Sequence, residues 1–349
     1  MTMTRWLSGG LAAAALALGA AACGGDEDGG DSAEANSEAK KTEELTVYSG
    51  RDEELVAPLL ERFEQETGIR IRARYGETAE LASTIREEGD ATPADVFFGQ
   101  DAGALGALEQ AGALAELPAA TLEKVEPRFR SPGGRWVGTS GRVRVIAYDT
   151  RTVTEDELPD SVLDVTDEAW KGKVGWAPTN ASLQTFVTAL RKVEGEDRAR
   201  NWLEGMEAND ARAYESNGLV RDAIAAGDVE LGLINHYYVA QARAEEGEGY
   251  PVGLHFPEGD VGSLINVAGT GVLAGSEDGA AARRLVDFLL SDASQRYFAK
   301  ETKEYPVAGD ARPDPSLPAL EEIDQPEVTL NELGDLEGTL ELIESSGVL

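Results

Sequence analysis

The chain has 349 residues, with 31 basic side chains against 65 acidic ones and a formal net charge of −34. A surface this acidic repels phosphate backbones, which argues against a nucleic-acid-binding protein. The single Cys excludes an internal disulfide and Cys-rich zinc sites, and two His residues are too few for a His-only metal site. Because 42% of the residues are hydrophobic, the chain can form a packed core, and its length is typical of two domains.

The first 44 residues are predicted to be a targeting signal followed by a flexible linker. Arg5 precedes an apolar run, Leu11 to Ala22, that is too short to span a membrane and is typical of a signal peptide over residues 1–22. The run ends in small residues before Cys23, which resembles the bacterial lipobox and predicts that Cys23 carries the lipid of a lipoprotein. An ordinary cleaved signal with an incidental cysteine is the alternative. Residues 23–44 have no large apolar side chain and are predicted to be a flexible tether.

The body then alternates strands and helices. Apolar and alternating segments predict strands at 45–48, 69–74 and 95–98, and helical spacing predicts intervening helices that end at Gly68 and Gly89. Strand, helix, strand in this order is typical of a mostly parallel sheet covered by helices, an α/β fold. Such sheets bind ligands beyond the C-terminal ends of their strands, which are followed here by the loops 49–52 and 99–101.

A second series of similar size starts near residue 143. It contains strands at 143–148, 174–176 and 230–235, with helices expected around 182–193, 202–206 and 219–226, and a last helix at 336–345. Two α/β series of this kind predict two lobes with a cleft between them.

The chemistry-bearing residues are few. The sequence has no dinucleotide-binding glycine motif, no phosphate loop and no Gly-x-Ser-x-Gly motif, and His236 and His255 are interpreted as structural. The unusual feature is the tyrosine pair Tyr237 and Tyr238 directly after an apolar strand. Beyond the strand end, both hydroxyls can enter one cleft, where ionised phenols would suit a hard cation such as Fe(III). The alternative to a metal-binding role is that both tyrosines are structural residues packed in the core.

The order and spacing of several segments resemble the bacterial ferric-ion-binding proteins, which are the solute receptors of iron ABC transporters. The resemblance covers nearly all of residues 45–349. It rests on VYSGRDEEL (47–55), FEQETGI (63–69), EEGDATPADVFF (87–98), SGRVRVIAYD (140–149), SVLDVTDEAWKGKVGW (161–176), NWLEGM (201–206), LINHYYVA (233–240) and EYPV (304–307).

The resemblance implies a type II periplasmic-binding-protein fold, in which two α/β lobes are joined by a crossover hinge. The expected N-terminal lobe is 45–142 with 268–318, and the expected C-terminal lobe is 143–267 with 319–349. The family binds Fe(III) between the lobes through a tyrosine pair, carried here onto Tyr237 and Tyr238. In many members an anion of the carbonate or phosphate type completes the coordination, and its contacts match Thr179, Asn180, Ala181, Ser182, Asn217 and Asn235.

Two positions depart from the family pattern. Many members place a His in the first strand–helix loop, where this chain has Asp52 followed by Glu53, and many place a Glu after the third strand, where it has Gln100. Asp101 stands where an uncharged anion contact is common and would repel a phosphate close by. Two phenolates leave Fe(III) with one positive charge, which the Asp52 carboxylate or the bound anion would neutralise. We therefore expect Asp52 or Gln100 to close on the metal, although Asp52 is equally explained as a helix-start charge.

The predicted protein binds and does not catalyse. It would be a monomer on the outer face of the cell membrane, held there by its lipid and delivering iron to the permease and ATPase of an ABC transporter. The closest alternative is a receptor of the same fold for a polyamine, thiamine or an organic anion. A surface hydrolase using Asp52 with Asp101, or a cell-wall interaction module, would be a protein of another class.

Overall fold

The computed structural model describes residues 43–247 and 249–348, so the predicted signal peptide, Cys23 and nearly all of the predicted tether lie outside the described residues. Glu44, assigned to the tether from its composition, is the first residue of strand β1 (Glu44–Ser49). Its carboxylate pairs with Arg70 on the neighbouring strand at 2.7 Å, which a composition argument does not anticipate. None of the helices in the described part of the chain combines the length and the apolar character needed to span a membrane.

The first lobe is built on a mixed sheet. β1 pairs in parallel with β2 (Arg70–Tyr75) and β3 (Val96–Gly99), which confirms the parallel arrangement predicted for the first three strands. β9 (Ile265–Val272) then runs antiparallel to β3, and β10 (Tyr305–Pro306) pairs antiparallel with β4 (Val137–Asp149). The sheet as a whole is therefore mixed and not mostly parallel, because β9 and β4, which come from later parts of the chain, continue it beyond β3 with antiparallel pairing.

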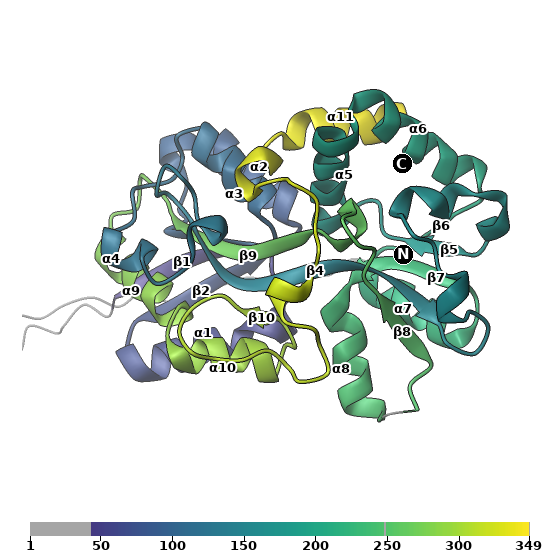
Figure 1. Ribbon diagram of the computed structural model, residues 1–349. Helices are drawn as coiled ribbons and strands as arrows, with labels where there is room; N and C mark the ends of the chain where they lie inside the picture. The colour runs from purple at the N-terminus through teal and green to yellow at the C-terminus, as the bar shows by residue number, and fades with distance from the viewer. Residues whose placement is uncertain (1–42, 248, 349) are drawn as a thin grey trace, which may run out of the picture. The chain divides into compact units, whose positions relative to one another are not determined.

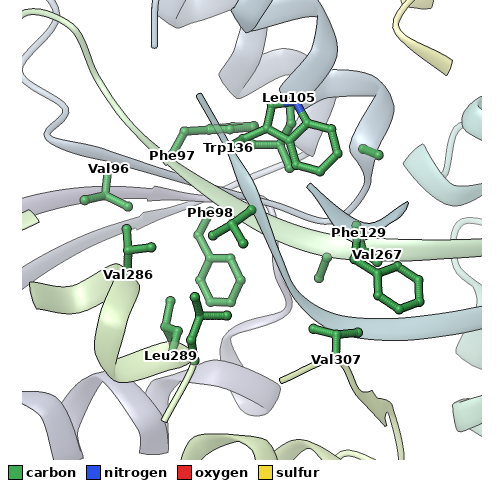
Figure 2. Packing of buried hydrophobic residues seen from close by; sticks show 14 of the residues in the cluster. Val96, Phe97, Phe98, Leu105, Phe129, Trp136, Val267, Val286, Leu289 and Val307 are labelled. Atoms are coloured by element: carbon green, nitrogen blue, oxygen red, sulfur yellow. The ribbon is translucent and has the colours of Figure 1, made fainter. Parts of the chain in front are cut away.

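Helices cover both faces of this sheet (Figure 1). They are α1 (Glu53–Thr67), α2 (Thr78–Glu88), α3 (Ala102–Gln110), α4 (Ala119–Leu122), α9 (Gly279–Leu289) and α10 (Asp292–Lys300). Figure 2 shows why β3 must be apolar throughout: Phe97 lies near Leu105 and Trp136 on one face, and Phe98 points toward Val286 and Leu289 on the other. Side chains alternate along a strand, so a strand covered on both faces has no polar side.

The long strand β4 (Val137–Asp149) extends through both lobes, and all of its residues are buried. Its first half pairs with β9 and its second half pairs with β7 and β8 (Figure 1). The sequence predicted only the second half of this strand, because the glycines and serine of the first half weaken the strand pattern. The shared strand is the structural basis of the predicted crossover.

The second lobe repeats the layered arrangement. Its further strands are β5 (Val174–Trp176), β6 (Arg212–Ala213), β7 (Leu231–Asn235) and β8 (Val252–His255). Its helices are α5 (Ala181–Glu194), α6 (Glu196–Ala208), α7 (Asn217–Ala226) and α8 (His236–Glu246). α5 and α6 cover one face with an aromatic cluster in which Trp202 contacts Trp176 and Phe186 edge to face. α7 and α8 cover the other face.

The C-terminal segment contacts both lobes. Leu330 and Leu333 pack into the core of the first lobe, whereas Leu342 and Ile343, on α11 (Leu336–Ser345), pack into that of the second. The segment thus passes between the lobes close to Gly334.

Candidate functional site

A cavity of about 400 Å³ lies between the lobes. Both loops predicted from the strand order contribute to its wall on the first lobe, and the N-termini of α5, α7 and α8 form the wall on the second. It is lined by Gly50, Arg51, Asp52, Glu53, Tyr75, Gly76, Glu77, Thr78, Gln100, Asn180, Ala181, Glu215, Ser216, Gly218 and Tyr238. Free N–H groups and the positive end of the dipole make helix N-termini favourable places for anions.

The tyrosine pair lies in the first turn of α8, because β7 ends at Asn235 and the helix begins at the next residue. The helical turn brings the two rings side by side, with centroids 4.4 Å apart and planes inclined by 29°. Tyr237 is fully buried, and Tyr238 is partly buried and lines the cavity. The start of a helix, and not an irregular strand end, is what directs both phenols to the same region.

The surroundings of the pair keep both phenols neutral in the metal-free protein. Burial raises the pKa of Tyr237, and the Arg51 guanidinium is the strongest opposing influence. Burial raises the pKa of Tyr238 well above its usual value, with Tyr237 and Asp52 adding to the effect. A hard cation can reverse this, since its charge favours ionised oxygen ligands, and would displace a proton from each phenol.

His236, next to the pair, is a structural residue. Its Nδ1 accepts a hydrogen bond from the Val143 amide at 3.1 Å, and its Nε2 lies 3.0 Å from the carbonyl oxygen of Lys303. Burial lowers the pKa of His236 to about 4, so the ring is neutral at pH 7 and Nε2 carries the proton that Lys303 accepts. His236 therefore anchors α8 to β4 and to the segment before β10.

Gln100 is buried beneath the pair and makes two specific contacts. Its Nε2 donates to the hydroxyl oxygen of Tyr237 at 3.0 Å, and its Oε1 accepts from Arg51. Arg51 also forms an ion pair with Glu304 at 2.7 Å, in which neither side chain is exposed. A continuous polar chain thus connects Glu304 to the tyrosine pair.

Two further arginines are buried beside the pair, on β4. Arg142 is 1% exposed, and within the described residues none of its three guanidinium nitrogens has a hydrogen-bond partner. Arg144 donates to the Leu233 carbonyl at 2.6 Å, and burial together with Arg142 lowers its pKa to about 9. Leaving a buried charge without partners costs several kcal/mol, so this region favours an added negative charge.

Asp101 is a helix cap and not an open carboxylate. Its Oδ1 accepts from the Ala104 amide at 3.1 Å at the start of α3. Burial raises the pKa of Asp101, and nearby Arg142 opposes that shift. Three buried guanidinium groups (Arg51, Arg142 and Arg144) therefore stand beside two buried carboxylates, those of Glu304 and Asp101, so the buried part of this region carries excess positive charge.

Four of the six residues that matched anion contacts form one hydrogen-bonded group. Asn180 Oδ1 accepts from the Ser182 amide at 3.1 Å and from Asn217 Nδ2 at 3.0 Å, and Asn235 Nδ2 donates to Ser182 Oγ at 3.1 Å. In the described part of the chain, Asn217 Oδ1 and Asn235 Oδ1 have no hydrogen-bond partner. Ala181 lines the cavity, while Thr179 is exposed and takes part only through its carbonyl oxygen, which accepts from Gln184.

Asp52 stands at the mouth of the cavity. It is exposed and occupies the N-cap position of α1, but its side chain makes no capping hydrogen bond. Glu53, Glu77 and Glu215 line the same cavity, so its mouth is acidic while its floor is cationic. An acidic mouth attracts cations toward the cleft.

Sequence reasoning missed the buried charges Arg51, Arg142, Arg144 and Glu304. One signal for them was present: Arg142 and Arg144 stand two positions apart in an otherwise apolar strand, which places both on one face of a sheet. Side chains of His, Cys, Asp and Glu do not gather in threes or more to form a metal site anywhere in residues 43–247 and 249–348.

The fold and the cavity between its lobes define a solute-binding protein. In agreement, the family model described as "Bacterial extracellular solute-binding protein" matches residues 91–326. The "Fe(3+)-binding periplasmic protein" of Serratia marcescens is 33% identical over 308 residues, covering 87% of this chain and 90% of that protein. The "Major ferric iron-binding protein" of Neisseria meningitidis serogroup A is 32% identical, covering 87% and 93%.

A solved structure supports the same assignment. Iron-bound HitA from Pseudomonas aeruginosa superposes with a TM-score of 0.84 at 34% identity, covering 87% of this chain and 99% of that chain. The chain belongs to the bacterial ferric-ion-binding protein family. The family model and the two relatives named above are described as binding proteins.

Proposed function

We propose that this protein captures Fe(III) in the cavity between its lobes and releases it to a membrane transporter. The observation that carries the proposal is the stacked pair Tyr237 and Tyr238, of which Tyr238 lines the cavity, in a chain whose relatives are named as ferric-iron-binding proteins. Each phenol would lose its proton to become an anionic oxygen ligand, the type of ligand that a hard trivalent cation favours.

A small anion of the carbonate or phosphate type completes the proposed site. Two phenolates leave Fe(III) with one positive charge, and the buried arginines add more. The amide oxygens, hydroxyl and helix starts of the group Asn180, Ala181, Ser182, Asn217 and Asn235 lie on the same lobe as the tyrosines, as does Thr179 at its edge. Arg142 faces the tyrosines from the first-lobe half of β4, where its charge interacts with Tyr237. An anion there would supply hydrogen-bond acceptors for the Arg142 guanidinium and would neutralise the complex. The Asp101 carboxylate already caps α3, so it would act on the anion only indirectly, through Arg142.

This role for Arg142 predicts the behaviour of Arg142→Met. The metal-free variant should unfold at the same or higher denaturant concentration, because an unpaired buried charge is replaced by an apolar side chain. The gain in iron affinity that wild type shows when bicarbonate or phosphate is added should fall by roughly ten- to a hundred-fold, the value of a charge-assisted contact. Iron titrations with and without each anion measure it, and an undiminished anion effect would remove Arg142 from the site.

From the first lobe, Asp52 is proposed to close on the metal, because the amide oxygen of Gln100, the other expected candidate, faces Arg51. Asp52→Asn separates the two interpretations of Asp52, because Asn is as good a helix-start residue as Asp but carries no charge. We expect metal-free stability to change by only a few tenths of a kcal/mol and iron affinity to fall about ten-fold or more. Chelator competition measures the affinity. An unchanged affinity would leave Asp52 as a helix-start charge alone.

The proposed cycle uses the two lobes as a hinged pair. Iron would bridge them, and the closed form would deliver it to the permease and ATPase of an ABC transporter. The expected lobe boundaries are 45–142 with 268–318 and 143–267 with 319–349. Because Leu330 and Leu333 pack in the first core, we propose that the last boundary lies near Gly334. The protein would act as a monomer outside the cell membrane, with residues 1–22 removed and Cys23 carrying lipid.

The direct test is to add Fe(III) to metal-free protein and record visible spectra. A phenolate-to-iron charge-transfer band with one iron per chain supports the proposal, and an anomalous-scattering map of the loaded crystal would identify the metal and its ligands together. A colourless protein whose melting temperature does not change with iron would contradict it. Stabilisation by a polyamine, thiamine or an organic anion instead would favour a receptor for that solute, and turnover of a hydrolysable substrate would favour an enzyme.

A further inference from the structure

A buried hydrogen-bonded chain runs through the first lobe toward the tyrosines. It starts at Glu304, whose two carboxylate oxygens accept from Ser140 Oγ at 3.1 Å and from Thr302 Oγ1 at 2.9 Å. The same carboxylate holds Arg51 at 2.7 Å. Glu304 is 0% exposed and Arg51 1% exposed, so this ion pair is held out of water by the surrounding structure. The position of the Arg51 guanidinium is therefore set by three other residues.

Arg51 in turn orients the amide of Gln100. A guanidinium has only donors, so the Gln100 atom that faces Arg51 must be the amide oxygen. The NH₂ group then points the other way, and it meets Tyr237 Oη at 3.0 Å. Arg51 follows β1, Gln100 follows β3 and Glu304 precedes β10, so all three belong to the first lobe, whereas Tyr237 belongs to the second. The last hydrogen bond of the chain thus crosses from one lobe to the other.

This arrangement leaves Gln100 poorly suited to be a metal ligand. An amide binds a hard cation through its oxygen, and here that oxygen is held by a positive charge. Turning the amide toward a cation would break the contact with Arg51 and bring two cationic groups together. The amide nitrogen, in contrast, is already directed at the oxygen that the proposed iron site would ionise. A phenolate accepts a hydrogen bond more strongly than a phenol, so the contact gains strength when iron binds.

We propose that Gln100 is a positioning residue that closes the first lobe on the loaded second lobe by donating its amide N–H to the phenolate oxygen of Tyr237. Through Gln100 the first lobe then recognises a ligand oxygen of the metal, and not the metal itself, and the chain Glu304–Arg51–Gln100 holds the donor in place. This inference rests on the proposed function, since it assumes that Tyr237 binds Fe(III). A hydrogen bond from Gln100 and direct ligation of iron by the first lobe can be distinguished, because they predict different changes in the colour of the complex when Gln100 is removed.

Gln100→Met tests the proposal, because it keeps the size of the side chain and removes the donor. A donated hydrogen bond lowers the energy of the phenolate electrons, so its loss should move the charge-transfer band to longer wavelength. The iron stoichiometry should remain one per chain, and the affinity should fall roughly ten- to a hundred-fold, as expected for a hydrogen bond to a charged group. Small-angle scattering should show that iron compacts the variant less than wild type. Gln110→Met, on the exposed face of α3, is the matched control and should behave as wild type.

A second pair of variants locates the effect. In a Tyr238→Phe background the remaining band arises from Tyr237, and Gln100→Met should still shift it. In a Tyr237→Phe background the remaining band arises from Tyr238, and Gln100→Met should leave it in place. A weaker affinity with an unshifted band, or equal shifts in both backgrounds, would overturn the proposal. If wild type itself forms no coloured complex, the proposed iron function has failed; if wild type is coloured and Gln100→Met is identical to it, only this inference has failed.

Discussion

Replacing both tyrosines, as Tyr237→Phe and Tyr238→Phe together, should abolish the iron-dependent colour and lower iron affinity by roughly ten-thousand-fold, if each charged oxygen contact is worth about a hundred-fold. The reason is that the pair supplies the two anionic oxygens of the proposed site, and phenylalanine cannot replace them. Visible spectroscopy and chelator competition measure the two effects.

The loss must be separated from misfolding. The metal-free double variant should keep a cooperative unfolding transition, because the rings and their stacking remain and only two hydroxyls are removed. Tyr214→Phe, a half-buried tyrosine of the second lobe that does not line the cavity, should retain colour and affinity. A double variant that still forms the coloured complex would show that other residues bind the iron.

Iron affinity should rise steeply with pH, by about 100-fold per pH unit between pH 5 and pH 8 with the anion in excess. Burial raises the pKa of Tyr237 and Tyr238, so in this range both phenols carry protons before iron binds. Each iron therefore displaces two protons, and each proton contributes about ten-fold per pH unit. The sign follows directly: lowering the pH favours the protonated, metal-free site and promotes release.

Competition titrations at several pH values measure this slope, with correction for the protonation of the competing chelator. Tyr238→Phe provides the internal comparison, because a site with one phenolate should show only about ten-fold per pH unit. A wild-type slope no steeper than that of Tyr238→Phe would mean that Tyr238 stays protonated in the complex and is not a ligand.

Much of the architecture could be predicted from sequence because it depends on local patterns. The spacing of apolar residues and the positions of Gly68 and Gly89 predicted α1 and α2, and both glycines do end these helices. The first three strands are parallel, as the strand–helix order indicated. The sequence could not indicate that β9 and the first half of β4 join the same sheet, because such pairings link segments more than 100 residues apart.

For the tyrosine pair, part of the arrangement could be predicted from sequence and part was decided by the fold. The apolar strand before it and the family resemblance indicated Tyr237 and Tyr238, and the structure stacks their rings, with Tyr238 lining the cavity. The two side chains share a direction because a helix starts at His236 and turns them by its own geometry, and not because the strand ends irregularly. Local sequence indicated that the strand ends there, but not which conformation follows.

The residues that surround the pair were decided by tertiary structure alone. Asp101 reads from sequence as an open negative charge, yet packing makes it the cap of α3 beside Arg142. Gln100 reads as a substitute for a ligand, yet its amide is held between Arg51 and Tyr237. The sequence by itself determined the alternation of elements, the acidic charge and the tyrosine pair, because these depend on neighbours along the chain. Which buried charges meet, and which atom of Gln100 faces the phenol, depends on side chains up to 253 residues apart that only the folded lobes bring into contact.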